Sequence, residues 1–133
     1  MILKELNVAE SQKKMRILII EDNIESQLIL KVYLRELYLV DIAEDAESGL
    51  NFLKSSPYDL ILLDINLPGK LNGEDVLKEV RNDILLKKLP VVVITAYALK
   101  GDKERFLNQG ASDYLSKPVE KQMLRDTISK HLP

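Results

Sequence analysis

The chain has 133 residues, a length that suits one domain with an ordinary hydrophobic core. Its composition is 46% hydrophobic, 30% charged and 5% aromatic, which is typical of a soluble globular protein and disfavours intrinsic disorder. A net charge of -2 provides no global field for nucleic acid or an anionic membrane, and the absence of cysteine excludes disulfides and thiolate metal sites.

The chain begins with residues 1–14, which we interpret as an N-terminal extension whose order the sequence leaves open, and residues 15–133 form the predicted domain. The extension lacks the continuous apolar stretch of a signal peptide. All apolar runs are far shorter than the roughly 20 residues that cross a bilayer. We therefore expect a cytoplasmic protein with no membrane or nucleic-acid partner.

From Arg16 onward, short apolar runs alternate with helical patterns. The predicted strands are 16–20, 39–43, 59–65, 90–96 and 112–116. The predicted helices are 24–38, 45–56, 73–83, 101–110 and 119–132, with Gly110 as a candidate C-terminal cap. Strands that read as continuous Val, Ile and Leu runs are typical of a parallel sheet covered on both faces. The pattern predicts an α/β fold, a doubly wound five-stranded parallel sheet with five flanking helices.

Charged and polar residues end four of these strands: Glu21-Asp22, Asp64, Thr95 and Lys117. The carboxyl ends of parallel strands lie on one edge of the sheet, and ligands of doubly wound domains bind beyond that edge. Asp64 is the most informative, because a carboxylate that ends an apolar strand is costly unless something pairs with it. Clustered carboxylates repel one another, so at least one pKa should rise unless a cation is bound. Mg²⁺ suits such oxygen ligands, and with it one carboxylate becomes a candidate nucleophile toward a phosphoryl group.

Each of these residues also has a simpler interpretation. Glu21-Asp22 suits the N-cap of the helix that follows, Lys117 before Pro118 suits a surface turn, and Thr95 is unremarkable at a strand end. His131, the single histidine, is expected to be a solvated residue at a helix end. The joint occurrence of Glu21-Asp22, Asp64, Thr95 and Lys117 on one edge of the predicted sheet favours a functional site.

Four segments resemble a known family. They are "IIEDN" at Glu21-Asp22, "LLDINLPG" at Asp64, "VITAYALKGD" at Thr95 and "GASDYLSKP" at Lys117. Over about residues 16–132 the chain is similar to the response regulator receiver domain of two-component signalling. The sequences of these segments resemble most those of receivers of hybrid kinases and of single-domain phosphorelay regulators. The resemblance implies a flavodoxin-like sheet with strand order 2-1-3-4-5.

The resemblance also implies roles for individual residues. Asp64 would be the phosphoacceptor and Lys117 the partner of a phosphoryl oxygen. Asp22 would bind Mg²⁺ directly, Glu21 through water and Asn66 through its backbone carbonyl.

Three further positions carry the family's switch. Thr95 would be the hydroxyl that moves to the phosphoryl group, and Tyr114 the aromatic side chain that turns inward with it. Ala96 matches a small position that leaves the phosphate accessible. A half-buried strand tyrosine is the simpler interpretation of Tyr114. One departure is visible: four residues separate Pro68 from Gly73, where the family usually has three, which puts the loop geometry beside the phosphate in doubt.

The implied function is a signalling switch that accepts a phosphoryl group from a histidine kinase or a histidine phosphotransfer protein, is not a conventional enzyme, and resets by slow self-dephosphorylation. Output would be binding to a downstream protein or onward phosphotransfer, and a phosphorylation-dependent homodimer is open. Ile24 and Leu28 on the first helix are predicted to dock a helical phosphodonor. The alternative is that the apolar side chains of this helix face are only core residues or ordinary surface residues.

Four other interpretations remain. Two of them keep the family: a receiver fragment of a hybrid histidine kinase or larger regulator, and a pseudo-receiver that binds partners without phosphorylation. A haloacid-dehalogenase-like phosphatase would need a second acid where Asn66 stands, and a flavin-binding module would need a phosphate-cradling loop where the acidic "EDNIES" stands.

Overall fold

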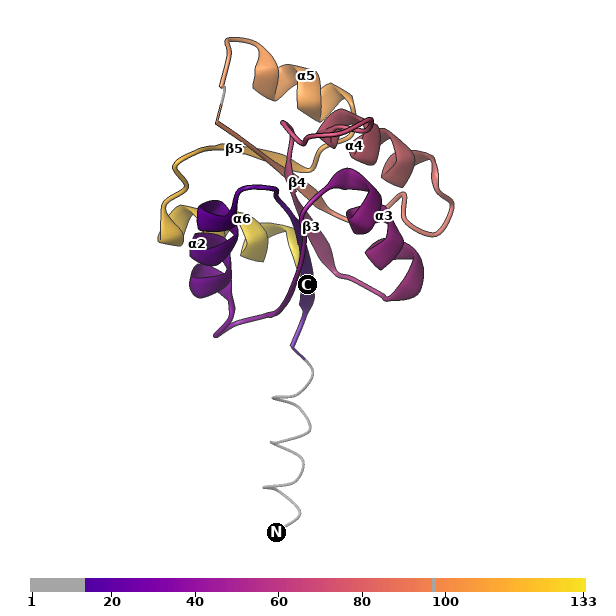
Figure 1. The fold of residues 1–133 in the computed structure, drawn as a ribbon. Coiled ribbons are helices and arrows are strands. Elements are labelled where there is room, and N and C mark those ends of the chain that lie inside the picture. The colour runs from indigo at the N-terminus through magenta and orange to yellow at the C-terminus, as the bar shows by residue number, and fades with distance from the viewer. Residues whose placement is uncertain (1–13, 97) are drawn as a thin grey trace.

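The computed structural model describes residues 14–96 and 98–133, and it contains one five-stranded parallel sheet in the order β2-β1-β3-β4-β5 (Figure 1). The strands are β1 (Arg16–Ile20), β2 (Leu39–Ala43), β3 (Leu60–Asp64), β4 (Val91–Thr95) and β5 (Asp113–Ser116). The helices are α2 (Ile24–Leu34), α3 (Ala46–Ser55), α4 (Gly73–Asn82), α5 (Asp102–Asn108) and α6 (Lys121–His131). The predicted fold class and strand order are confirmed, while the extension over residues 1–14 lies outside the described residues except for Lys14.

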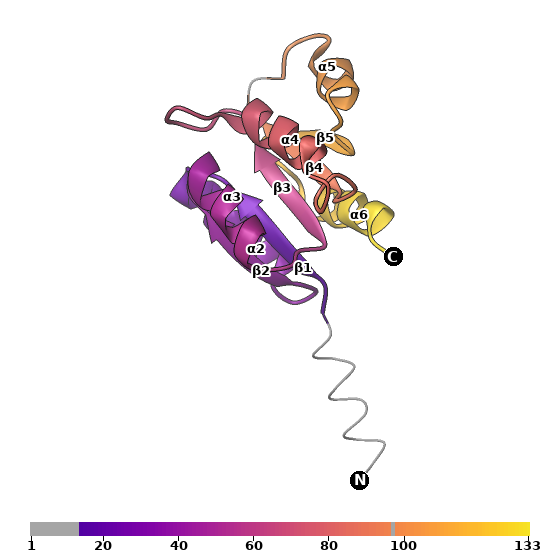
Figure 2. The same cartoon turned by 90° about the vertical axis from the view of Figure 1, so that its right-hand side faces the viewer.

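The helices form two layers around the sheet (Figures 1 and 2). Helices α2 and α6 cover one face, and α3, α4 and α5 cover the other. Strand residues alternate between these faces because successive side chains of a strand point in opposite directions. In β1, Ile17 and Ile19 pack against Leu30 of α2 and Leu124 of α6. Among the described helices, none is long and apolar enough to cross a membrane.

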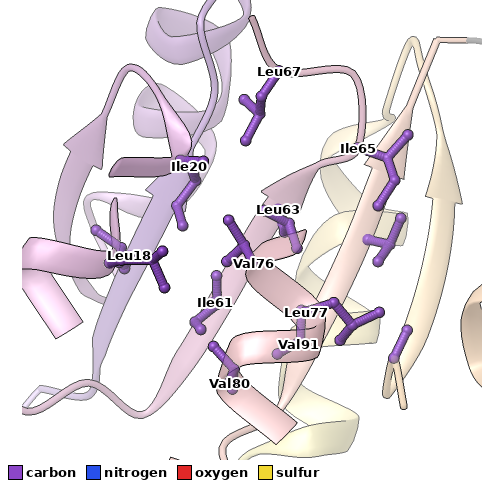
Figure 3. Close-up of a cluster of buried hydrophobic side chains, with 14 of the residues drawn as sticks. Leu18, Ile20, Ile61, Leu63, Ile65, Leu67, Val76, Leu77, Val80 and Val91 are labelled. Atoms are coloured by element: carbon purple, nitrogen blue, oxygen red, sulfur yellow. The ribbon is translucent and has the colours of Figure 1, made fainter. Parts of the chain in front are cut away.

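The larger of the two apolar layers lies between the sheet and helices α3 to α5 (Figure 3). Leu18, Ile61 and Leu63 supply the strand side of this layer, and Val76 and Val80 supply the α4 side; all five are fully buried. Burying a Val, Leu or Ile side chain contributes about 1.5–3 kcal/mol to folding. Both faces of the three central strands are buried in this way, so the polar groups at the strand ends are held on a rigid edge.

Several helices are shorter than the sequence predicts. The helix expected over 24–38 ends at Leu34, because the backbone N–H groups of Leu37 and Tyr38 both donate to the Leu34 carbonyl and reverse the chain into β2. Helix α6 begins at Lys121 and not at Val119, with Glu120 as its N-cap. Gly110 lies one residue beyond the C-cap of α5 with φ 104°, the left-handed position that glycine favours after a helix.

The register of the strands sets which residues meet at the edge. Ile20 of β1 is opposite Leu63 of β3, so Glu21 follows at the level of Asp64. Asp64 is opposite Ile94, and Thr95 is opposite Ser116, so Lys117 follows immediately beyond Thr95. The parallel sheet therefore brings residues that are up to 96 positions apart in the sequence to one edge.

Candidate functional site

Three carboxylates gather at this edge of the sheet. Glu21, Asp22 and Asp64 each offer an oxygen, and these oxygens lie within 4.8 Å of one another. Glu21 is 1% exposed and Asp64 is 5% exposed, whereas Asp22 is open to solvent. Carboxylate oxygens at this spacing, with one side facing water, are the ligands that Mg²⁺ prefers. The three carboxylates predicted as metal ligands are therefore brought together by the fold.

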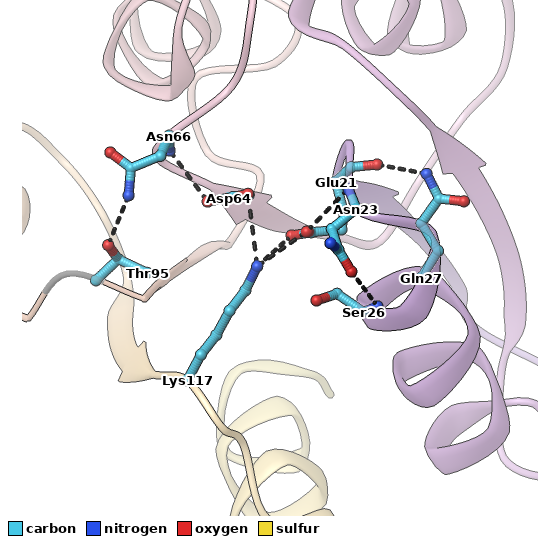
Figure 4. Close-up of polar contacts among 8 residues, drawn as sticks. All are labelled: Glu21, Asn23, Ser26, Gln27, Asp64, Asn66, Thr95 and Lys117. Carbon is cyan, nitrogen blue, oxygen red and sulfur yellow. Dashed lines mark hydrogen bonds and ion pairs between the residues drawn. The ribbon is translucent and has the colours of Figure 1, made fainter.

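Lys117 provides the positive charge of the site (Figure 4). Its Nζ donates to both carboxylate oxygens of Glu21, at 2.9 and 2.8 Å, and lies 3.5 Å from Asp64 Oδ2. Only 19% of its side chain is exposed. The interpretation of Lys117 as a surface residue in a turn is therefore wrong. The ammonium lies where it can partner an oxygen of a group carried by Asp64.

Asn66 connects the phosphoacceptor candidate to the neighbouring strand. Its backbone N–H donates to Asp64 Oδ1 at 3.0 Å, and its side-chain Nδ2 donates to Thr95 Oγ1 at 3.1 Å (Figure 4). Thr95 is 1% exposed, and its backbone carbonyl accepts from the Lys117 N–H at 2.8 Å. The sequence pointed only to the backbone carbonyl of Asn66, because nothing in the spacing along the chain indicates where a two-torsion amide reaches across strands.

Burial raises the pKa of Glu21 to about 7; the Lys117 hydrogen bond opposes this rise and the charge of Asp64 adds to it. The expected rise in one carboxyl pKa is confirmed, with burial and not repulsion as its larger cause. The ionised form of a carboxyl group buried in this way is stabilised by any further cation that replaces part of its lost hydration. The electrostatics of the site thus favour a divalent ion.

The helix that follows the acidic pair is capped by another residue. Asn23 is the N-cap of α2, and its side chain accepts from the Ser26 N–H at 2.9 Å. The interpretation of Glu21-Asp22 as the cap is therefore wrong. Gln27 reaches back and donates to the Glu21 carbonyl at 2.6 Å, which ties the first turn of α2 to the end of β1. An Asn directly before an apolar helical pattern was the available signal for this cap.

Tyr114 is half-buried in β5, as its simpler interpretation expects, with its ring stacked on Phe106 and the ring centroids 5.9 Å apart. Its hydroxyl is buried and has no hydrogen-bond partner among the described residues. Burial raises its pKa, and the charge of Asp102 adds to that effect. A buried hydroxyl without a hydrogen-bond partner is costly, so other interactions, such as the contact with Phe106, have to stabilise this side-chain position.

The lengthened loop is anchored at both ends. Leu67 is buried at its start, and Gly73 donates its N–H to the Ile65 carbonyl at 3.1 Å at its end. Only a glycine fits there, because a Cβ on Gly73 would lie 2.5 Å from the Asp64 carbonyl oxygen. The exposed tip at residues 68–70 turns at Gly69, with φ 97°. The tip and the start of α3 line a groove of about 300 Å³ that includes Asp45 and Lys70.

His131 lies at the end of α6 as expected, but it is half-buried and not solvated as predicted. Its Nε2 lies 2.9 Å from Asp113 Oδ2, and its side chain is only 23% exposed. Lys130 binds the same carboxylate oxygen at 3.1 Å. The C-terminal turn of α6 is therefore held against the start of β5, at the opposite end of the sheet from Asp64.

The chain is similar to known proteins over most of its length. The model of the response regulator receiver domain family matches residues 17–129. The chain is 36% identical over 118 residues to the chemotaxis protein CheY of Pseudomonas aeruginosa, covering 87% of this chain and 94% of that protein. It is 34% identical over 126 residues to a hybrid signal transduction histidine kinase of Dictyostelium discoideum, covering 88% of this chain but only 7% of the kinase.

Solved structures give the same result. The receiver domain of a Pseudomonas aeruginosa sensor histidine kinase, which has a magnesium ion coordinated in its active-site cleft, has a TM-score of 0.81 at 33% identity, covering 89% of this chain and 97% of that one. The chemotaxis protein CheY4 of Vibrio cholerae has a TM-score of 0.82 at 25% identity, covering 90% of this chain and 99% of that one.

Proposed function

The chain belongs to the response regulator receiver family of two-component signalling, whose members are regulatory phosphoacceptor switches, and from this premise we propose that Asp64 takes the phosphoryl group. The observation that supports the assignment is the pairing of Lys117 with both Glu21 and Asp64 in a nearly buried cluster. Asp64 is the carboxylate that ends the central strand β3. It lies 3.5 Å from the Lys117 ammonium and accepts from the backbone N–H of Asn66, whose side chain donates to Thr95.

The donor set fits Mg²⁺. Side-chain oxygens of Glu21, Asp22 and Asp64, together with the Asn66 carbonyl, would hold the ion. When bound, the ion supplies positive charge that offsets the charge of the phosphoryl oxygens. Lys117 pairs with one phosphoryl oxygen, and the Thr95 hydroxyl donates to another. The residues of the chain thus orient the group and neutralise its charge.

The proposed step is an in-line transfer. An Asp64 carboxylate oxygen attacks the phosphorus of a phosphohistidine, the new P–O bond forms, and the P–N bond breaks with its electron pair returning to the imidazole. Thr95 then moves toward the phosphoryl group, and the added charge of about -1.5 to -2 shifts an existing conformational equilibrium. Slow attack of water on the acyl phosphate, which resets the switch, is part of the same proposal.

The phosphodonor surface lies on α2 beside the site. Ile24 and Leu28 are 69% and 58% exposed, far more than a core position allows. A separate apolar groove of about 380 Å³, which neither residue lines, lies between Ile29 and Tyr33 of α2 and the segment Pro118-Val119 that follows Lys117. A helix of a histidine kinase or phosphotransfer protein seated on Ile24 and Leu28 would bring its phosphohistidine to Asp64. Ile24→Glu and Leu28→Glu should therefore slow transfer from such a donor, and unchanged transfer would contradict this docking surface.

The context of the domain in the whole protein is a separate proposal. The chain spans 7% and 14% of the length of two histidine kinases that it resembles, against 94% of the chemotaxis protein. We propose that the domain signals through a downstream protein or by onward phosphotransfer, and that it forms a homodimer when phosphorylated. Sedimentation with and without a beryllium fluoride mimic tests the dimerisation.

The central experiment is incubation with Mg²⁺ and acetyl phosphate, followed by intact-mass measurement. The wild type should gain one phosphoryl group, Asp64→Asn should gain none, and Asp126→Asn, an exposed aspartate of α6, should behave as the wild type. Modification of Asp64→Asn to the same extent would refute the assignment. No modification of the wild type, with no change in tyrosine fluorescence on adding the mimic, would favour a pseudo-receiver.

A further inference from the structure

The turn that joins α4 to β4 presents an apolar pair to solvent. Ile84 is 81% exposed and Leu85 is 89% exposed, the two highest values among the large apolar side chains of the described residues. Isolated apolar side chains are ordinary on a protein surface, but two adjacent ones in nearly full contact with water are costly. The proposed phosphoryl transfer uses neither of them, so this apolar pair, Ile84 and Leu85, has to be explained in another way.

Hydrogen bonds fix the turn, so the exposure of the apolar pair does not come from a loose loop. Asp83 Oδ1 accepts from the backbone N–H groups of Leu85 at 2.8 Å and Leu86 at 3.2 Å. Arg81 donates to the Leu89 carbonyl at 2.7 Å, which closes the turn against the end of α4. Leu86 and Leu89 pack against the core, so the turn directs these two side chains inward and leaves the apolar pair outside.

Two lysines complete the exposed surface of the turn. Lys87 and Lys88 follow the apolar pair after one residue, and both are exposed. Apolar side chains next to lysines are typical of segments that enter the surface of an anionic membrane. The apolar groups reach the boundary of the acyl chains, while the long lysine side chains keep their ammonium groups at the level of the headgroups.

The turn also lies at the basic end of the molecule. The helices run antiparallel to the strands that they connect, so their C-termini lie at the end of the sheet opposite Asp64 (Figure 1). Four of the helices have a basic residue in the last turn: Lys31 in α2, Lys54 in α3, Arg81 in α4 and Lys130 in α6. Glu21, Asp22 and Asp64 lie at the other end. The net charge of -2, from which we expected no membrane partner, is thus the sum of an acidic end and a basic end.

The carboxylates at the basic end do not reverse this charge. Several of them are neutralised in ion pairs: Asp41 with Arg16, Asp113 with Lys130 and Glu36 with Arg125. Asp59 and Asp83 accept backbone N–H groups. Four cations that form no ion pair within the described part of the chain outnumber these two: Lys54, Arg81, Lys87 and Lys88. The charge beside the apolar pair is therefore positive.

We propose that the apolar pair and the two lysines of the turn seat the domain on an anionic membrane surface. Ile84 and Leu85 enter the boundary between headgroups and acyl chains, and Lys87 and Lys88 bind anionic headgroups. A protruding apolar pair needs a matching pocket on a protein partner, whereas a bilayer accepts the pair without one. The binding is reversible, because two apolar side chains bury far less surface than a membrane-spanning helix. The opposite end of the sheet faces away from the membrane, so Asp64 stays open to a phosphodonor.

The test is co-sedimentation of the full chain with vesicles of phosphatidylcholine alone and of phosphatidylcholine mixed with phosphatidylserine. The wild type should bind the mixed vesicles more tightly than the neutral ones, and added salt should weaken this binding. Ile84→Ser together with Leu85→Ser should lower the affinity for mixed vesicles about ten- to hundredfold. Lys87→Gln together with Lys88→Gln should lower it about ten- to thirtyfold.

The matched control uses the loop that follows β4 at the acidic end. Leu99 is 70% exposed and is followed by the exposed Lys100, so this loop also presents an apolar side chain beside a lysine. Leu99→Ser together with Lys100→Gln should bind the mixed vesicles as tightly as the wild type. The chain has no tryptophan, so a single introduced tryptophan reports on entry into the bilayer. The emission of Leu85→Trp should move to shorter wavelength with mixed vesicles, and that of Leu99→Trp should not.

The inference fails if the wild type does not bind the mixed vesicles, if the serine or glutamine variants of the turn bind them as tightly as the wild type, or if both tryptophan variants shift alike. Sedimentation of the protein without lipid distinguishes a second copy of the chain from a membrane. A dimer that Ile84→Ser with Leu85→Ser abolishes would assign the apolar pair to a protein interface and would also overturn the inference. Circular dichroism of each variant checks that it is folded.

Discussion

Replacing Glu21 by Gln should make the metal-free protein more stable at high pH. Burial raises the pKa of Glu21 from 4.5 to about 7, so between these values the folded protein binds a proton more readily than the unfolded chain. The free energy of unfolding then falls as the pH rises, by up to about 1.4 kcal/mol per pH unit. Over the whole interval the loss amounts to about 3 kcal/mol.

Glutamine has nearly the same shape and is neutral at every pH, so Glu21→Gln removes this loss. At pH 5 the two proteins should unfold at nearly the same urea concentration, because the wild-type carboxyl is largely protonated. At pH 8 the variant should be more stable by about 1–3 kcal/mol, the lower values reflecting the weaker bond from Lys117 to an amide oxygen.

The assay is urea unfolding in EDTA at pH 5, 6.5 and 8, followed by circular dichroism. Titrating groups that do not interact with Glu21 are common to both proteins and cancel in the difference. Glu79→Gln, an exposed carboxylate of α4, is the matched control and should show no pH-dependent difference. Adding Mg²⁺ at pH 8 should stabilise the wild type more than Glu21→Gln. Parallel stability curves for the two proteins between pH 5 and 8 would refute the reasoning.

Three further changes test other parts of the structure, each by urea unfolding. Gly73→Ala would place a Cβ 2.5 Å from backbone atoms and should cost about 3 kcal/mol or more, whereas Gly69→Ala, strained only by its φ of 97°, should cost about 1–2; equal losses would contradict this packing. Arg81→Met removes donors to the Gly110 and Leu89 carbonyls, both at 2.7 Å, and should cost about 2–3 kcal/mol, with a loss below about 0.5 arguing against the contacts. Burial raises the pKa of Asp113, but hydrogen bonds from His131, the Tyr114 N–H and Lys130 outweigh it and hold that pKa below 3.8. Asp113→Asn should therefore be less stable than the wild type near pH 7, and the difference should shrink as the pH falls below 3.8; a constant difference would exclude the ionised carboxylate as its cause.

Local patterns carried the order and type of the elements. Continuous apolar runs in alternation with helical periodicity require a parallel sheet covered on both faces, since each pattern reports burial within one segment. Because parallel strands end on a common edge, the positions of Glu21, Asp22, Asp64, Thr95 and Lys117 at strand ends already brought the site together. The family motifs added the identity of the acceptor and its partners.

Contacts between segments could be decided only by the packed structure. Lys117 binds Glu21 more closely than Asp64, and Asn66 reaches Thr95, because the strand register and the side-chain rotamers place those atoms within hydrogen-bond distance. Likewise, Asn23 takes the cap of α2, and His131 finds a carboxylate on β5. A hydrogen bond depends on a few tenths of an ångström and on direction, and the linear spacing of residues contains neither quantity. The chain's pattern thus located the chemistry, and the tertiary structure selected which groups hold one another.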